Sequence, residues 1–275
     1  MSISIEDAAP PLPDQILYRW HGRYGLVLGT CGEDWLMASA FDGVFLINIA
    51  RRTIRCFVTR FKDPAWLDVF VRRVLPRVAI LCGATAIHAA AVASHGGSLL
   101  LLGASGAGKS TLSASLGAAG WDVLSDDIAI LRHDTVAEAM PATTGVCVWN
   151  DSRAGLKLPA SLCQPMPGYE GKVRFVPQRE EDIVPVPLRA LIFLARSSDV
   201  DHPRFEQLSG SEGLARAMQQ RIRFNPADAS GCETTGTFAR IGAIVRETPC
   251  YRMVYPASYD ALPDVASALA TMVQP

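Results

Sequence analysis

The sequence predicts an α/β fold preceded by a small β-rich region. At the start of the α/β part, the apolar run 98–102 leads into a glycine-rich turn and then into a segment with helical spacing. Strand-like and helical segments follow to the C-terminus, whereas residues 16–60 hold only short β-type runs separated by glycines. We therefore expect an N-terminal β-rich region over 1–63 and an α/β domain over 64–275.

The first part of the chain is expected to form a small antiparallel meander after a frayed start. Residues 1–15 are Pro-rich, and we expect them to be frayed. The expected strands are 16–20, 26–28, 35–38, 44–49 and 53–59. Helical spacing from 61 to about 81 predicts a helix, which Pro76 is expected to kink or divide.

The second part is expected to alternate strands with helices. The expected strands are 86–92, 98–102, 123–125, 128–131, 188–194 and 251–255, with a weaker one at 172–176. The expected helices are 109–119, 211–223, 234–246 and 259–272. The sequence after Pro141 is turn-rich, with glycines at 145, 155, 168 and 171.

Length and composition fit a globular, cytoplasmic protein. The 275 residues are 49% hydrophobic and 19% charged, which is not a disordered composition. The net charge of -1 gives no electrostatic reason to expect a nucleic acid or an anionic membrane as a partner. The seven cysteines lack metal-clip or redox spacing, so we expect reduced thiols, and the acidic start MSISIEDAAP is not a secretory signal. A polar Ser-His-Gly-Gly turn interrupts the apolar stretch 78–102, so we expect no membrane span.

The strongest motif is a phosphate-binding loop at 103–111, which fits the pattern G-x-x-x-x-G-K-[ST]. It consists of Gly103, Ala104, Ser105, Gly106, Ala107, Gly108, Lys109, Ser110 and Thr111. Its glycines lack the Cβ atoms that would block a tight wrap, so backbone N–H groups can surround phosphates at the start of the next helix. Lys109 would reach the β- and γ-phosphates, and the Ser110 hydroxyl would coordinate magnesium. We expect ATP with Mg²⁺, the alternative being a glycine-rich turn without a ligand.

Two adjacent acids and one histidine accompany this loop. Asp126 and Asp127 end a short apolar strand, where one carboxylate could hold magnesium and the other could take a proton from an attacking hydroxyl. The alternative is a solvated turn that closes the strand. His88 lies in an apolar strand, and from its position alone a satisfied core histidine is favoured over a catalytic one.

Taken together, Ile87-His88, the loop and the segment Val123–Asp127 resemble the catalytic domain of HPr kinase/phosphorylase, whose fold is akin to PEP carboxykinase. The resemblance is strongest over 86–132 and weaker through 185–194 and 249–256, while residues 1–75 do not resemble that family's usual N-terminal domain. The whole chain is similar to shorter HPr-kinase-related proteins. Some of these accompany ribosomally made peptides, including lasso peptides, and phosphorylate them on serine.

The resemblance implies a role for each matching residue. Lys109 and Ser110 match the phosphate and metal positions, and Asp126 matches the base that acts on the acceptor serine. Asp127 matches the adjacent acid near metal and histidine, and His88 matches the family's histidine, which is expected to assist Asp126. Thr111 replaces the glutamate of the bifunctional enzymes, and the glycine-rich signature of phosphorolysis is not found, so kinase activity alone is favoured.

Lys172 and Arg174 are further candidates for phosphate or substrate contacts. They follow Gly168 and Gly171, which suggest a mobile flap that could close over the phosphates. Ordinary solvated surface is an equal alternative for these cations.

The leading hypothesis is therefore an ATP-dependent serine kinase that acts on a peptide or small protein, such as a lasso-type precursor peptide. The alternatives are a P-loop ATPase or GTPase, a regulatory nucleotide-binding module, and a kinase that acts on HPr itself. The family forms ring-like assemblies, so the resemblance also allows a homo-oligomer.

Overall fold

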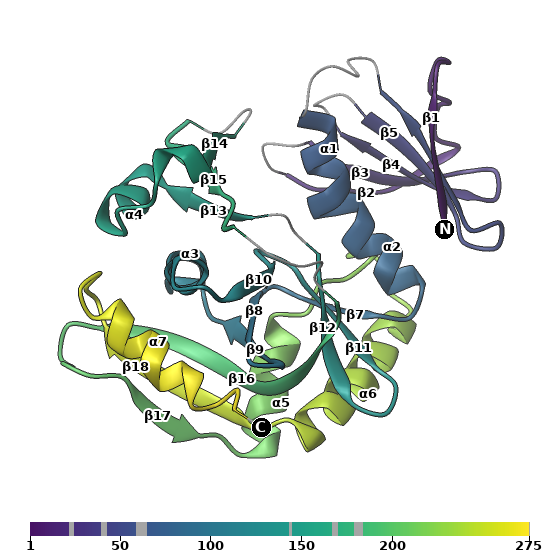
Figure 1. Cartoon of the computed structure of the whole chain (residues 1–275). Coiled ribbons are helices and arrows are strands. Elements are labelled where there is room, and N and C mark those ends of the chain that lie inside the picture. The colour runs from purple at the N-terminus through teal and green to yellow at the C-terminus, as the bar shows by residue number, and fades with distance from the viewer. Residues whose placement is uncertain are drawn as a thin grey trace. The chain divides into compact units, whose positions relative to one another are not determined.

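The computed structural model describes residues 1–21, 25–39, 43–58, 65–142, 145–166, 170–178 and 184–274 (Figure 1). The chain forms two compact units, of which the first comprises 1–83 with 223–234 and the second 84–222 with 235–275. The boundary expected between 63 and 64 differs from this division. The helical segment before residue 83 belongs to the first unit, and a later stretch of chain returns to it.

The first unit contains a six-stranded sheet. Its strands are β1 (Ser2–Glu6), β2 (Gln15–Arg19), β3 (Val27–Cys31), β4 (Asp34–Ser39), β5 (Gly43–Asn48) and β6 (Thr53–Phe57), in the order β1-β6-β5-β4-β3-β2. Strands β2 to β6 form the expected antiparallel meander. The expected fraying of 1–15 is wrong at its start, because β1 pairs in parallel with β6. Without β1, the outer edge of β6 would have unpaired backbone groups. Strand β1 pairs with these groups.

The helical segment of the first unit is continuous across Pro76. It consists of α1 (Ala65–Val69), a π-helical turn (Phe70–Val74) and α2 (Leu75–Leu81). Pro76 lies in the first turn of α2, where its missing N–H removes a hydrogen bond from the preceding helix. The π-helical turn accommodates this loss, so the expected kink or division appears as a local change of helix type.

The second unit contains a nine-stranded mixed sheet. Its strands are β7 (Thr85–Ile87), β8 (Ala90–Ser94), β9 (Gly97–Leu102), β10 (Asp122–Ser125), β11 (Ala129–His133), β12 (Ala137–Met140), β16 (Val186–Ser197), β17 (Arg204–Gln207) and β18 (Cys250–Pro256). Strands β9, β16 and β18 run parallel side by side. Alternate residues of β9 point to opposite faces, with Leu99 and Leu101 in one apolar cluster and Leu100 and Leu102 in another. This sheet is therefore buried on both faces, as its continuous apolar runs predict.

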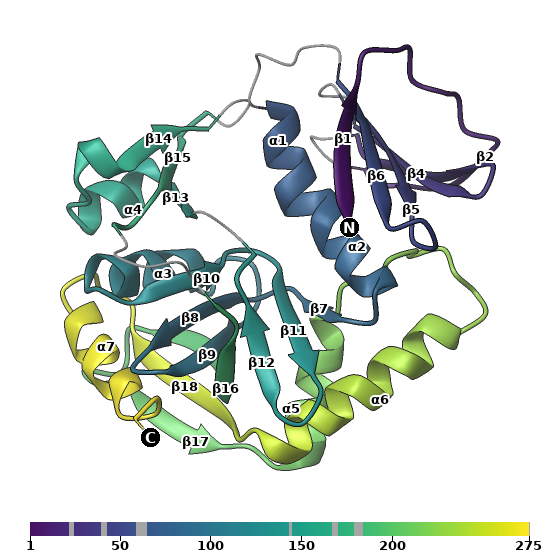
Figure 2. The same ribbon diagram turned by 45° about the vertical axis from the view of Figure 1, so that its right-hand side comes forward.

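Helices cover both faces of this sheet (Figure 2). Helices α3 (Lys109–Ala118) and α7 (Leu262–Ala270) contribute Leu112 and Val265 to one apolar cluster. Helices α5 (Gly210–Gln219) and α6 (Cys232–Glu247) contribute Ala217 and Ile244 to the other. The result is a mixed α/β fold in which the loop between β9 and α3 lies at the carboxyl end of a buried parallel strand.

The expected single strand at 86–92 is divided at His88. Strand β7 pairs with β11, whereas β8 pairs with β9 and β10. At the crossing point the His88 N–H donates to the carbonyl of Gln220 at 2.7 Å. The histidine therefore lies where the chain changes its neighbours in the sheet, outside a regular ladder.

A small three-stranded sheet fills much of the stretch predicted to be turn-rich. It has the order β13 (Val146–Trp149), β15 (Lys172–Phe175) and β14 (Cys163–Pro165). The short helix α4 (Asn150–Gly155) and a 3₁₀ turn (Ala160–Leu162) lie between its strands in sequence. Of these elements the sequence indicated only the strand near 172–176, because the others are very short.

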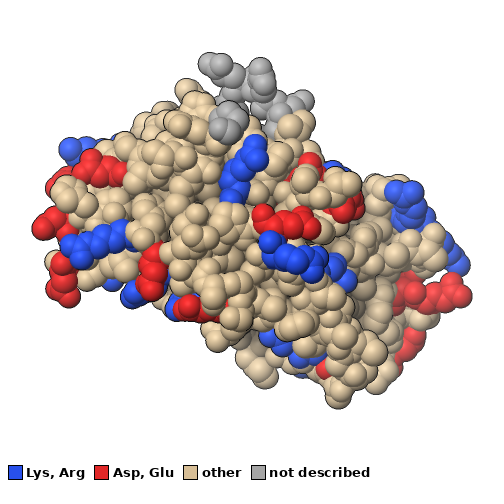
Figure 3. Space-filling model, turned by 90° about the horizontal axis from the view of Figure 1, so that it is seen from below, with Lys and Arg blue, Asp and Glu red and all other residues tan. Residues whose placement is uncertain are grey.

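Charged side chains of both signs are interspersed on the face shown in Figure 3. The chain's formal net charge of -1 agrees with this mixture. In the described part of the chain, no helix combines the length and apolar character needed to cross a membrane.

Candidate active site

The loop between β9 and α3 has the backbone conformation that its glycines allow. Gly106 and Gly108 have φ values of +81° and +94°, in the left-handed region that favours glycine. Gly108 is the N-cap residue of α3, so the unpaired amides of the first helical turn lie directly after the loop. Such a helix start attracts anions through its N–H groups and its partial positive charge.

Two side chains from neighbouring parallel strands hold this loop. The Tyr255 hydroxyl, from β18, donates to the Ala107 carbonyl at 2.9 Å, and Arg196 Nη2, from β16, donates to the Gly106 carbonyl at 2.7 Å. Burial raises the pKa of Tyr255 to about 12, so its hydroxyl keeps its proton and remains a donor at neutral pH. No pattern in the sequence marks either residue, because both lie far along the chain from the loop and form no local motif.

A Gly108→Ala variant is expected to disrupt the loop. Its Cβ would overlap the Tyr255 hydroxyl and lie 3.2 Å from Arg196 Cδ. Gly120 has a similar φ of +91° but open space around it, so Gly120→Ala is a matched control for backbone strain alone. We expect urea unfolding to show an extra loss of about 1–3 kcal/mol for Gly108→Ala, together with weaker MgATP binding. Equal stability of the two variants and unchanged MgATP binding would contradict this account of the loop.

Lys109 is buried and turns back over the loop that precedes it. The residue is only 9% exposed. Its Nζ donates to the Gly103 carbonyl at 2.7 Å and to the Ala104 carbonyl at 3.3 Å. Desolvation by burial lowers the lysine pKa, while the charges of Asp127 and Asp126 oppose that shift. The ammonium group is therefore bound to two loop carbonyls and is influenced by the charges of the two acids.

Asp126 joins the loop to the three-stranded sheet. The Ser110 hydroxyl donates to Asp126 Oδ1 at 2.9 Å, and the Cys147 N–H of β13 donates to Asp126 Oδ2 at 2.9 Å. The residue is 7% exposed. The adjacent hydroxyl and carboxylate oxygens are ligand types that Mg²⁺ prefers, so these two residues fit a magnesium ion.

A nucleotide-bound magnesium ion needs few protein ligands, because phosphate oxygens and water complete its coordination. Within the ranges that the structure describes, no group of three or more His, Cys, Asp or Glu side chains is arranged to hold a metal by itself. A site shared between Ser110, Asp126 and a phosphate chain is compatible with that composition.

Asp127 has a strained backbone and contacts His88. Its φ is +77°, a left-handed conformation that is uncommon outside glycine and concentrates at functional sites. His88 Nδ1 lies 2.8 Å from the Asp127 carbonyl oxygen and 3.2 Å from Asp127 Oδ1. Because both oxygens are acceptors when the carboxylate is charged, Nδ1 must be the protonated ring nitrogen. The two side chains are 27% and 35% exposed, so this pair is accessible.

The structure brings together Lys109, Ser110, Asp126, Asp127 and His88. The contacts within the group differ from those expected at Ser110. The resemblance implies that Ser110 and Asp127 lie at the metal, that Asp127 lies near the histidine, and that His88 assists Asp126. In the structure Ser110 contacts Asp126, and His88 contacts Asp127.

Lys172 and Arg174 both lie on β15, next to β13. Lys172 pairs with Trp149 and places its Nζ over that ring, 4.5 Å from the centroid, in a cation–π contact. Arg174 pairs with Cys147, the residue whose N–H binds Asp126. The strand is thus connected to the site through β13, whereas Gly168 of the expected flap lies outside the described residues. Their role toward phosphate or substrate stays a prediction.

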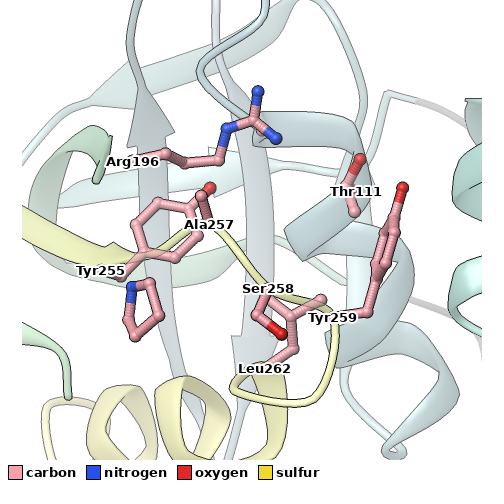
Figure 4. Close-up of a pocket in the computed structure, with 9 residues that line it drawn as sticks. Thr111, Arg196, Tyr255, Ala257, Ser258, Tyr259 and Leu262 are labelled. Atoms are coloured by element: carbon pink, nitrogen blue, oxygen red, sulfur yellow. The ribbon is translucent and has the colours of Figure 1, made fainter. Parts of the chain in front are cut away.

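A cavity of about 230 Å³ lies beside the loop (Figure 4). It is lined by Gly108 and Thr111, by Arg196, and by Tyr255 to Tyr259 together with Leu262. Thr111 is the last residue of the sequence motif, and its hydroxyl lies 3.1 Å from the Ser152 hydroxyl of α4.

Comparisons with known proteins give matches among solved structures only. No protein-family model matches the sequence, and no curated protein matches it. The structure of the Hpr(Ser) kinase/phosphatase from Coxiella burnetii is similar, with 13% sequence identity, a TM-score of 0.35 and coverage of 68% of this chain and 94% of that chain. The proposals below are based on the contacts within the site and not on this similarity.

Proposed function

We propose that the chain is a kinase that transfers the γ-phosphoryl group of MgATP to a serine hydroxyl of a peptide or small protein. The observation that supports this most is the pairing of Ser110 with Asp126 beside the accessible Asp127–His88 pair, directly at a glycine-rich loop. A loop for phosphates, oxygen ligands for a metal and a separate carboxylate for a hydroxyl proton are the groups that phosphoryl transfer requires.

The loop and α3 supply phosphate binding in this proposal. The backbone N–H groups of 103–111 surround the phosphate chain, and the N-terminus of α3 adds its partial positive charge. Lys109 exchanges its contacts with the Gly103 and Ala104 carbonyls for contacts with phosphate oxygens. In that exchange Lys109 keeps the number of its hydrogen bonds and gains negatively charged partners.

Ser110 and Asp126 hold magnesium in this proposal. A bound magnesium ion neutralises charge that develops on the phosphate oxygens. Asp126 suits this role better than the role of base, because it is buried and both of its carboxylate oxygens already accept hydrogen bonds. We therefore assign Asp126 to the metal in place of Asp127, which the resemblance implies for that position.

Asp127 is the proposed base. Its carboxylate takes the proton of the acceptor serine as the serine oxygen forms a bond to the γ-phosphorus, and the bond from that phosphorus to the leaving oxygen of ADP breaks. His88 donates from Nδ1 to the carbonyl and carboxylate of Asp127 and so orients this strained residue. His88 is thus a positioning residue for Asp127.

We propose that the acceptor is a serine of a ribosomally made precursor peptide, of the lasso type that the sequence resemblance indicates. The test is incubation with γ-labelled ATP, Mg²⁺ and a candidate precursor peptide, with its Ser→Ala peptide as the matched control. HPr is a second acceptor to be tested in the same way. Label in the serine peptide but not in the alanine peptide is the expected result. Label that appears only as free phosphate would contradict the kinase proposal and favour an ATPase.

A further inference from the structure

The proposed catalytic groups do not line the cavity beside the loop. Its wall contains Gly108 and Thr111 from the loop, whereas His88, Asp126 and Asp127 are absent from its lining. Under the proposed function, the γ-phosphate must face these three residues. The other end of the phosphate chain, where the nucleoside is attached, must therefore leave the loop on another side.

The order of contacts in such loops indicates which side that is. Backbone N–H groups cradle the α- and β-phosphates, while the lysine reaches the β- and γ-phosphates. Ser110, the residue after Lys109, contacts Asp126 at 2.9 Å, so this part of the loop lies beside the acids. The cavity instead adjoins Thr111, the residue that follows Ser110 in α3. It is thus a compartment next to the loop whose lining lacks the groups proposed for phosphoryl transfer.

The lining of the cavity combines apolar surface with polar groups, which suits a flat group that carries polar atoms, as a nucleobase does. Leu262 is 3% exposed, and Pro256, Ala257 and the rings of Tyr255 and Tyr259 add apolar surface. Figure 4 shows Tyr259 near Thr111, with Arg196 and Tyr255 across from them. Ligand sites for planar organic groups are typically apolar and aromatic, with a few polar atoms that fix orientation.

The ring of Tyr259 is held in place although the residue is 40% exposed. It packs directly on Gly155 of α4, where an added Cβ would overlap three of its ring atoms. The same short helix contacts Thr111 through Ser152. An exposed aromatic ring is thus supported from behind, next to the last residue of the loop.

We infer that this cavity binds the nucleoside of the triphosphate, with the base stacked on the ring of Tyr259. The inference rests on the proposed function, because it requires a nucleoside triphosphate in the loop. It adds the part of the site that distinguishes a nucleotide from a bare phosphate chain. Aromatic stacking of this kind does not depend on the identity of the base, since every base has a π-face.

The test compares MgATP with inorganic triphosphate, which carries the phosphates but no nucleoside. Wild-type protein is expected to bind MgATP more tightly than magnesium triphosphate. Tyr259→Ala is expected to weaken MgATP binding about 10–100-fold and to leave triphosphate binding within about twofold. Tyr259→Phe keeps the ring and is expected to bind both probes as the wild type does. Gly155→Ala, which must displace the ring, is expected to reproduce the selective loss.

The outcomes separate this inference from the proposed function. If Tyr259→Ala binds both probes as tightly as the wild type, the cavity inference is overturned while phosphate binding stands. If Tyr259→Ala loses both probes equally, the residue supports the loop instead of a base, which also overturns the inference. If wild-type protein binds neither probe, the proposed function fails together with it.

Discussion

Asp127→Asn is expected to slow transfer of labelled phosphate to an acceptor peptide by about 10²–10⁴-fold, the usual contribution of a general base. The amide cannot accept the hydroxyl proton, but it has nearly the shape of the carboxylate and keeps an oxygen for His88 Nδ1. The side chain is 27% exposed, so the change buries no new polar group. Because Asp127 acts on the acceptor in this account, MgATP binding should change by only about threefold or less.

The measurement is single-turnover transfer at saturating MgATP, with calorimetry of MgATP binding in parallel. His88→Ala provides the comparison for positioning, and it should cost less than Asp127→Asn because it leaves the base in place. The two changes should also be non-additive, since both act through one carboxylate. Full transfer activity in Asp127→Asn would restore Asp126 as the candidate base.

Asp126→Asn is expected to weaken magnesium-dependent ATP binding by about 10–100-fold and to lower transfer at least as much. The change removes a charged oxygen next to the Ser110 hydroxyl but keeps an acceptor for that hydroxyl or for the Cys147 N–H. Binding of ATP measured without magnesium should not weaken, because the loop amides and Lys109 are unchanged. A magnesium titration of ATP binding distinguishes these two effects.

Ser110→Ala is the matched partner for this prediction. If Ser110 and Asp126 hold one magnesium ion, the double variant should be little worse than the more severe single variant. Urea unfolding must accompany the titration, since Asp126 is buried and its loss could disturb β13. Unchanged magnesium dependence in a folded Asp126→Asn protein would contradict the assignment of Asp126 to the metal.

The loop and its flanking elements could be predicted because their signals are local. An apolar strand, three glycines at fixed spacing, a lysine and a helix start are adjacent in the chain, and the structure places β9 and α3 there. The residues that secure the loop could not be found in this way. Arg196 lies 90 residues from Gly106, and Tyr255 lies 148 residues from Ala107. Only the pairing of β9, β16 and β18 brings them together.

The contacts of the two acids also depend on three-dimensional structure. Asp126 and Asp127 are neighbours with the same side chain, so sequence alone cannot assign them to different partners. The left-handed backbone of Asp127 and the break between β7 and β8 at His88 determine the observed pairing. Neither feature has a local signature, because aspartate and histidine also occur in ordinary strands and turns.

Short or edge elements account for most of the remaining differences. Strand β1 gains its hydrogen bonds from β6, some fifty residues later in the chain. The three-stranded sheet is built from short strands whose alternation is too brief to read. The contact of Lys172 with Trp149 likewise depends on the register between β13 and β15.

Calorimetric titration of the folded protein with MgATP tests the central claim most directly. The account predicts saturable binding that is largely lost in Lys109→Met, because the buried lysine then no longer provides a positive charge beside the phosphates. The Gly120→Ala protein should bind as the wild type does. A folded wild-type protein that takes up neither ATP nor GTP in the presence of Mg²⁺ would contradict the account.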